Sequence, residues 1–456
     1  MGDVGGFKMK KLVSLLLILV MVFSLAACGK KTETEEETTN AAVDTTEAAT
    51  EAPKLTGSIT VQAESTWLEY YQAAIDRVVA ENPEATIELI EVGSFDHLDT
   101  IDKTDINNTD VADVFALPLD RVYGLAQNEV LAGMDAMTMA ANVGGFADYE
   151  AGLGGNFKID GEYLAFPMNI ETLIAFANKT NASTTSVDLS KSVEFTTSAA
   201  DSVLIPVWNA WFGVAVTNSA NIELLGKKDD GTLFSDLTED WANLPAEKQA
   251  VFTALFDYWK AHNDAATGLW DENAAWGYMD GEFTTGGKAS LRISGAWDAG
   301  AFSGQAGNGA DLQVLPLNQI TVSGAPLTHW KGGWGLGINA RNEADAEKMA
   351  LAQAVIEEIM NPEFAVEFYK GLGKIMENVD PAVYAASDLD DASKAVIDAT
   401  FKSYQDAPAR PLFTEWGQVW DTWKNGLLSW SAVKPATAEA AYAEVQASFK
   451  AMMLNF

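Results

Sequence analysis

The chain has little positive charge and almost no cysteine. Its 456 residues include 65 acidic residues against 29 lysines and arginines, which gives a formal net charge of -36 at pH 7. Charge of that sign, spread along the chain, argues against nucleic acid, anionic lipid and acidic polymers as ligands. The single cysteine excludes an intramolecular disulfide, so stability must come from packing.

Signatures of common enzymes are also missing. The three histidines, His97, His262 and His329, are widely separated, and no nucleophile-elbow, zinc-protease or P-loop pattern occurs in a suitable context. Asp229–Gly231 and Asp388–Asp391 lack the full spacing of a calcium loop. We therefore expect no metal, no cofactor and no enzymatic activity. Counting alone does not exclude a pair of carboxylates that hydrolyses glycosides, so a surface carbohydrate-active hydrolase stays the alternative.

No apolar run in the sequence is long enough to span a bilayer. The apolar run near the N-terminus is shorter and belongs to a different pattern. Lys8, Lys10 and Lys11 precede the apolar run Leu12–Leu25, and Ala26-Ala27-Cys28 follows. This order predicts a secretory signal peptide over residues 1–28. Cys28 stands where cleavage would fall, and the motif resembles the lipobox of bacterial lipoproteins, in which this thiol is acylated. We expect a lipid anchor at Cys28 that holds the protein on the extracellular face of the cytoplasmic membrane.

The segment that follows the cysteine has a biased composition. Residues 29–54 are dominated by Thr, Glu and Ala and contain no aromatic residue, which predicts a disordered linker. The remaining roughly 400 residues are too many for one core, so two domains are expected. The hydrophobic fraction of 48% is sufficient for both.

Tryptophan is abundant, with fourteen residues. An indole can stack on the apolar face of a pyranose, while neighbouring carboxylates, amides and guanidinium groups bond the sugar hydroxyls. Any single tryptophan is better explained as a core residue, but the set predicts at least three rings that face a sugar. The tryptophans with polar or glycine neighbours are Trp67, Trp208, Trp211, Trp297, Trp334 and Trp416.

The order of expected elements predicts an α/β architecture. Strands are expected at Ser58–Gln62, Ala85–Val92 and Val111–Leu117, with helices at Trp67–Glu81 and Arg121–Asn128 between and after them. A β-α-β-α opening of this kind implies a parallel sheet. Another strand is expected at Glu162–Pro167, and the further expected helices are Pro245–Ala261, Glu343–Met360, Pro362–Lys370 and Ala436–Met453.

Several segments in this order resemble one family. The stretch Asp113–Leu131 resembles the matching part of bacterial maltose/maltodextrin-binding proteins, which are extracellular solute-binding lipoproteins of sugar ABC transporters. Segments Asp160–Glu171, Ile293–Trp297 and Gly335–Ala340, together with Trp416, match further parts in the same order. Each motif is weak alone, and the collinear order over roughly residues 57–453 carries the resemblance.

The resemblance implies an α/β, two-lobed periplasmic-binding-protein-like fold with hinge crossovers and an interlobe ligand cleft. Lobe 1 is expected over residues 55–168 and 336–375, and lobe 2 over 169–335 and 376–456. It also implies a monomer that captures an oligosaccharide, most readily maltose or maltodextrin, and delivers it to the permease subunits of an ABC importer. A non-transport carbohydrate-binding lipoprotein stays open beside the hydrolase as an alternative.

The resemblance also proposes ligand-binding residues. The implied set is Glu64, Trp67, Asp120, Arg121, Glu171, Trp208, Trp211, Trp297 and Trp416. From the residues alone, Asp120 and Arg121 follow the carboxyl end of a buried strand, where open α/β sheets bind ligands, and an ordinary surface ion pair is the alternative. The chain departs from the family at Leu117, where well-studied members have tryptophan, and at Trp420, where a basic residue is expected. These departures leave the identity of the sugar open.

Overall fold

The structure is a computed structural model that describes residues 54–196, 202–228 and 230–456. The expected signal peptide, the lipidation site Cys28 and nearly all of the expected linker lie outside the described residues and stay predictions. Residues Lys54–Phe456 form one compact unit. Among the described helices, none is both long and apolar enough to cross a membrane.

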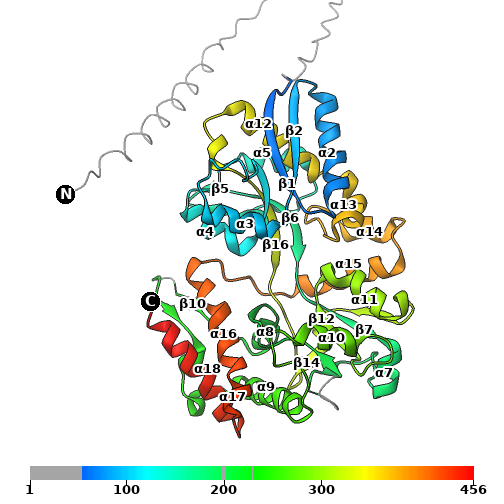
Figure 1. Cartoon of the computed structure of the whole chain (residues 1–456), viewed down its shortest axis with the longest axis vertical. Coiled ribbons are helices and arrows are strands. Elements are labelled where there is room, and N and C mark those ends of the chain that lie inside the picture. The colour runs from blue at the N-terminus through cyan, green and yellow to red at the C-terminus, as the bar shows by residue number, and fades with distance from the viewer. Residues whose placement is uncertain (1–53, 197–201, 229) are drawn as a thin grey trace, which may run out of the picture. The chain divides into compact units, whose positions relative to one another are not determined.

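This unit has two lobes, and each lobe has its own buried apolar cluster (Figure 1). Val61, Phe115 and Phe166 belong to the first cluster, whereas Phe176 and Phe252 belong to the second. Each cluster lies between a sheet and its covering helices, so the expected two-lobed α/β fold is confirmed.

The first lobe is built on a five-stranded sheet. Its strands, in spatial order, are β2 (Ala85–Glu91), β1 (Gly57–Ala63), β3 (Val114–Pro118), β16 (Gly332–Ile338) and β6 (Phe166–Glu171). Strand β1 runs parallel to β2 and β3, and β16 runs antiparallel to β3 and β6. A small hairpin, β4 (Lys158–Ile159) and β5 (Glu162–Tyr163), lies apart from this sheet.

Helix α2 (Leu68–Glu81) shows how the sequence pattern becomes packing. Its buried residues are Tyr70, Tyr71, Ala74, Ile75 and Val78, which lie on one face. Asn82 ends the helix, because its side-chain amide donates to the carbonyl oxygen of Val78 at 2.9 Å. The other helices of this lobe are α3 (Ser94–Lys103), α4 (Val122–Gln127), α5 (Ala136–Val143), α6 (Leu153–Asn156), α12 (Ala346–Ile359), α13 (Ala365–Leu372) and α14 (Pro381–Ala386).

The second lobe has a four-stranded sheet and more helix. The strand order is β13 (Leu312–Leu315), β7 (Ile174–Asn178), β12 (Leu291–Ser294) and β9 (Val203–Leu204), with β7 antiparallel to both neighbours. Short strands add β8 (Val193–Glu194), β14 (Ile320–Val322) and β15 (Ala325–Pro326) in one sheet, and β10 (Gly226–Lys227) and β11 (Leu233–Phe234) in another. The helices are α7 (Lys179–Thr185), α8 (Ala210–Thr217), α9 (Ala246–Asp264), α10 (Ala275–Phe283), α11 (Ala299–Gln305), α15 (Asp391–Gln405), α16 (Val419–Leu428), α17 (Trp430–Val433) and α18 (Ala438–Met453).

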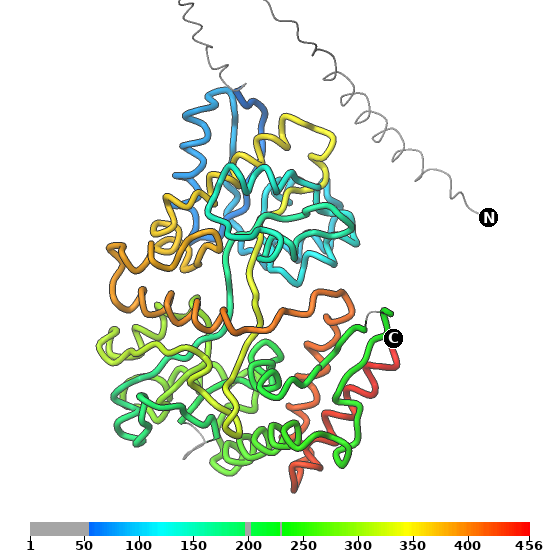
Figure 2. Tube along the Cα trace, turned by 180° about the vertical axis from the view of Figure 1, so that it is seen from behind, coloured from blue at the N-terminus to red at the C-terminus, as the bar shows by residue number. Residues whose placement is uncertain are grey.

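The chain passes between the lobes along paired strands. Strand β6 leads directly into β7, and β16 returns beside it, so the two crossing strands run next to each other in Figure 2. The backbones are close at Gly333, where a Cβ atom would lie 2.4 Å from the carbonyl oxygen of Asn169. A side chain at this position would push β16 away from β6, so the crossing depends on glycine there.

The third passage between the lobes lies later than the expected boundary at residue 375. Met376, Val379, Tyr384 and Leu389 all pack into the first cluster. Helix α14 stays with the first lobe because the hydroxyl of Tyr384 accepts from the backbone N–H of Met376, and its ring lies against Tyr369. The change occurs within α15, which contributes residues to both clusters.

A carboxyl group with an unusual pKa lies at this passage. The Glu377 Oε1 accepts from the backbone N–H of Leu153 at 2.7 Å, and its Oε2 has no hydrogen-bond partner among the described residues. Burial raises the pKa of Glu377 to about 7, and the bond from Leu153 opposes this only in part. Two neighbouring tyrosines, Tyr149 and Tyr404, also have pKa values raised by burial and stay neutral.

This arrangement predicts that Glu377 lowers the free energy of unfolding as pH rises from about 4.5 to about 7. The folded protein keeps a proton that the unfolded chain releases, so the stabilisation is present below pH 4.5 and lost through pH 7. Glu377→Gln should therefore be more stable than the wild type at pH 8, by about 1–3 kcal/mol, and equal to it near pH 4.5. Thermal unfolding at both pH values measures this.

The exposed carboxyl of Glu81 offers a matched control. Glu81→Gln should leave the difference between the two pH values unchanged. A Glu377→Gln effect of the same size at pH 4.5 and pH 8 would contradict the assigned pKa.

Candidate functional site

A cavity of about 980 Å³ lies between the two lobes. Its walls come from the loop after β1, the end of β3, both crossing strands, the loop before α8 and the start of α8, and the segment from Arg410 to Trp420. A cavity of this size, with contributions from both lobes, is typical of a small-molecule binding site.

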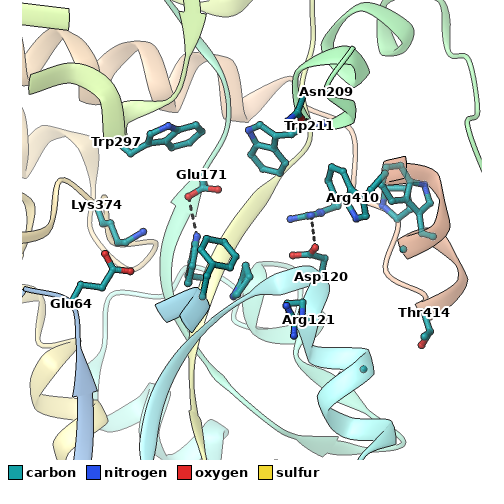
Figure 3. A pocket seen from close by; sticks show the side chains of 18 of the residues that line it. Glu64, Asp120, Arg121, Glu171, Asn209, Trp211, Trp297, Lys374, Arg410 and Thr414 are labelled. Carbon is teal, nitrogen blue, oxygen red and sulfur yellow. Dashed lines mark hydrogen bonds and ion pairs between the residues drawn. The ribbon is translucent and has the colours of Figure 1, made fainter. Parts of the chain in front are cut away.

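Aromatic rings form most of the apolar wall. Those that line the cavity are Trp67, Phe95, Trp211, Trp297, Trp334, Phe413, Trp416 and Trp420. Phe95 is 59% exposed and packs edge-on against Trp334, with centroids 5.4 Å apart. Trp297 is 44% exposed, and its ring centroid lies 6.3 Å from that of Trp211 (Figure 3). Exposed rings gathered in one cavity indicate a surface that a ligand covers.

One buried guanidinium organises the tryptophans of the second lobe. Arg410 is 8% exposed, and its guanidinium lies 5.0 Å from the ring centroid of Trp211, 5.4 Å from Trp330 and 5.8 Å from Trp420. Attraction between a cation and an indole face stabilises this arrangement, and more strongly when both are removed from water.

The carboxylate that neutralises Arg410 comes from the first lobe. Asp120 lies just after β3, and its Oδ2 is 3.0 Å from the Arg410 Nη2 (Figure 3). Arg121 makes a separate ion pair with Asp102 on the same lobe. The two neighbouring residues therefore have different roles: Asp120 joins the lobes across the cavity, and Arg121 is held within its own lobe.

A second polar cluster lies at the crossing strands. Glu171 Oε2, at the end of β6, accepts from the indole N–H of Trp334 on β16 at 3.0 Å. The Lys374 ammonium lies 4.6 Å from the centroid of the Trp334 ring and 5.5 Å from that of Trp67. Burial raises the pKa of Glu171 and lowers that of Lys374, and their mutual attraction opposes both shifts. This cluster offers a ligand hydrogen-bond acceptors and donors side by side.

The structure brings eight of the nine predicted site residues to this cavity. They are Glu64, Trp67, Asp120, Arg121, Glu171, Trp211, Trp297 and Trp416. Trp208 needs correction, because it is 1% exposed in the second core and its indole N–H donates to the Leu269 carbonyl oxygen at 2.8 Å. Contact of the eight with a ligand stays a prediction.

Sequence reasoning missed the two cations that line the cavity, Lys374 and Arg410. Neither Lys374 nor Arg410 lies in a recognisable motif, although Arg410 stands between Ala409 and Pro411. The available signal was indirect: the resemblance calls for a basic residue one turn after Trp416, and the chain has Trp420 there. The cation beside Trp420 is Arg410, which reaches it from an earlier segment.

Metal chemistry finds no support in the part of the chain that the structure describes. Within residues 54–196, 202–228 and 230–456, no group of His, Cys, Asp and Glu side chains is placed to hold a metal ion. What the cavity offers is stacking and hydrogen bonding, which suit a neutral, hydroxyl-rich ligand.

Comparison with known proteins supports the fold. No family model and no curated protein matches the sequence. The chain is similar in structure to the maltose-binding periplasmic protein of Listeria monocytogenes in complex with maltose, with a TM-score of 0.65 and 16% identity over 88% of this chain and 98% of that one. It is also similar to MalX of Streptococcus pneumoniae in complex with maltopentaose, with a TM-score of 0.64 and 16% identity over 86% and 99% of the two chains.

A third similar structure is the maltotriose-binding protein of Thermus thermophilus bound with maltotriose. Its TM-score is 0.58, with 18% identity over 86% of this chain and 99% of that one. The fold is therefore that of maltose- and maltodextrin-binding proteins, and the match extends over nearly the whole of each.

The ion pair between the lobes generates a prediction for stability. A double-mutant cycle of Asp120→Ala and Arg410→Ala should show a coupling of about 1–3 kcal/mol, because either single change leaves a charge without its partner at a mostly buried site. Urea unfolding of the ligand-free protein measures the four free energies of unfolding.

The pair Asp102 and Arg121 is the matched control, since it is more exposed and lies within one lobe. Its cycle should give a coupling of about 0–1 kcal/mol. Equally small couplings for both pairs would show that Asp120 and Arg410 do not hold each other in the ligand-free protein.

Proposed function

We propose that this protein captures an oligosaccharide, with maltose or a maltodextrin as the favoured ligand, and delivers it to an ABC importer. The observation that carries the proposal is the cavity between the lobes, in which aromatic faces alternate with carboxylates and cations. A pyranose has an apolar face for the rings and a rim of hydroxyls for the charged groups, so it matches both parts of the lining.

The energetics of such a site are adequate for a useful affinity. Covering 40–60 Å² of apolar surface on one sugar unit contributes roughly 1–1.5 kcal/mol. Each hydrogen bond to a charged group contributes about 1.5–3 kcal/mol. Two or three sugar units with several such contacts reach the roughly 8 kcal/mol that micromolar binding requires, after the cost of association.

Binding is expected to favour closure of the lobes. Glu64, Trp67 and Asp120 belong to the first lobe, whereas Trp211 and Trp297 belong to the second. A sugar that contacts both sets stabilises the arrangement in which they are close, by the difference in its affinity for the two states. The crossing strands β6 and β16 are the expected hinge, and the closed, loaded form is what the importer would recognise.

The proposal includes the expected anchor. Acylation of Cys28 would hold the protein on the extracellular face of the membrane, and residues 29–54 would give it reach toward the importer. The solved structures that share the fold are described as binding maltose, maltotriose and maltopentaose, which supports an α-glucan as the ligand.

One feature favours the hydrolase alternative. A glycosidase needs a carboxyl group that keeps its proton, and burial raises the pKa of Glu171 in this direction. The neighbouring charges of Lys374 and Arg410 act against it, because they favour the ionised carboxylate. The pKa of Glu171 stays raised nonetheless, and it is the solved structures with this fold, described in complex with intact sugars, that make binding without cleavage the better-supported function.

Calorimetry with maltotriose tests the proposed ligand. The purified protein should bind it with micromolar or better affinity, and Trp297→Ala should weaken binding by about tenfold through the loss of one stacking surface. Phe456→Ala, which removes an exposed ring outside the cavity, should not change the affinity.

Maltohexaose incubated with the protein should stay intact. Shorter products would favour the hydrolase, and heat with β-linked glucans alone would contradict the proposed sugar.

The anchor has its own test. The full chain expressed in a bacterium should sediment with membranes and incorporate a labelled fatty acid. Cys28→Ala should abolish the label and shift the protein to the soluble extracellular fraction, while its affinity for maltotriose stays the same. Label retained in Cys28→Ala would show that lipid is attached elsewhere.

A further inference from the structure

A second cavity of about 450 Å³ lies on the second lobe. Residues from α8, α10 and α11, from β12 and from the turn that precedes α11 line it, and these elements lie together in the lower lobe of Figure 1. Trp211 and Trp297 line both this cavity and the one between the lobes. The two cavities therefore border each other at these two residues.

The exposed tryptophans of the described chain gather here. Trp276 is 39% exposed and Trp297 is 44% exposed, and both line the second cavity. The ring of Trp276 is held in place by Phe212, at a centroid distance of 5.9 Å, and by Trp208, at 6.4 Å. An indole that is fixed on one side and left open to solvent on the other is a preformed stacking surface.

The second cavity has a polar part whose side chains hold one another in place. Arg292 is 4% exposed, forms an ion pair with Asp280 and stacks on Phe302 at 4.6 Å. Gln305 donates to Asp280 Oδ1 at 3.1 Å, and its own buried Oε1 has no partner among the described residues. The carboxylate of Asp280 is still 48% exposed, so it retains sites that can accept from a hydroxyl group.

We propose that this second cavity is an auxiliary carbohydrate subsite, which holds the sugar units of a longer oligosaccharide that extends past Trp297 from the cavity between the lobes. The proposal rests on the proposed function and adds a preference for chain length. It follows from the shared lining: a chain stacked on Trp211 and Trp297 borders the cavity that Trp276 and Asp280 also line.

A sugar suits this cavity better than a protein partner does. A protein contact surface usually has an apolar centre and a polar rim. Here charged and apolar groups are interleaved, because Arg292 and Asp280 lie among Trp276, Trp297 and Phe302 in the lining. Polar groups beside apolar faces are the arrangement that a pyranose requires.

Calorimetry with maltotriose and maltohexaose tests the subsite in the full-length protein. The wild type should bind maltohexaose at least fivefold more tightly than maltotriose. Trp276→Ala should reduce the affinity for maltohexaose by about five- to tenfold, the loss of one stacked sugar unit, and leave that for maltotriose unchanged. Asp280→Asn should act in the same direction, and Phe456→Ala should change neither affinity.

Ala301→Trp provides a second variant that leaves the core intact. Ala301 is an exposed residue of α11 that lines the second cavity, so an indole there fills the space without removing any buried contact. It should reproduce the selective loss of affinity for maltohexaose. This variant keeps the proposal testable even if Trp276→Ala destabilises the second lobe through its contacts with Phe212 and Trp208.

The outcomes separate the subsite from the proposed function. Equal affinities for the two sugars, unchanged in all three variants, would overturn the subsite and leave the proposed function standing. Variants that impair transport without changing the affinity for either sugar would also overturn the subsite, and would indicate that this surface contacts the importer. Absence of heat with every α-glucan would overturn both the proposed function and the subsite that depends on it.

Discussion

A guanidinium that is buried among tryptophans needs a carboxylate, and in this chain the carboxylate belongs to the other lobe. Removing Arg410 from water costs several kcal/mol, which stacking on Trp211 and Trp330 offsets only in part. Asp120 supplies the rest across the cavity. The charge that organises the aromatic wall of the second lobe is therefore satisfied only when the first lobe is close.

The same dependence between the lobes appears at the crossing strands. Trp334 and Glu171 lie on β16 and β6 and are joined by a hydrogen bond, and both also line the cavity. A ligand that contacts either of them contacts the segment through which the lobes are connected. The cavity lining and the connection between the lobes thus share residues, so a ligand in the cavity would act on this connection directly rather than through intervening structure.

Much of the fold was accessible from local patterns. The apolar spacing of α2 and the strands β1 and β2 were predicted with only small shifts at their ends, because a half-buried element carries its period in its own sequence. The expected strand Glu162–Pro167 was wrong in extent: it is divided between β5 and β6, and β6 continues to Glu171. An apolar run indicates burial, but it does not mark where a chain bends from one sheet to another.

The site shows why the remaining features could not be predicted. The cation of Arg410 reaches Asp120 from 290 positions away in the sequence, and no local pattern reports such a pairing. Trp208 and Trp211 stand only three positions apart, yet the first lies in the core and the second, at the start of α8, lines the cavity. Residues three positions apart lie near the same face of an α-helix. Trp208 precedes the first residue of α8, so this spacing does not place it on the same face as Trp211.

The indole N–H groups of this protein have different kinds of hydrogen-bond partner. Three core tryptophans donate this N–H to a backbone carbonyl oxygen: Trp208 to Leu269, Trp423 to Val207 and Trp430 to Ala441. These bonds fix the ring, because a buried donor without a partner would cost about 1–3 kcal/mol. The N–H of the buried Trp259 has no partner among the described residues. Trp334 instead donates to the carboxylate of Glu171, a side chain that lines the cavity and that a ligand can also reach. The partner of each N–H depends on the fold and not on sequence neighbours, so the sequence alone does not indicate it.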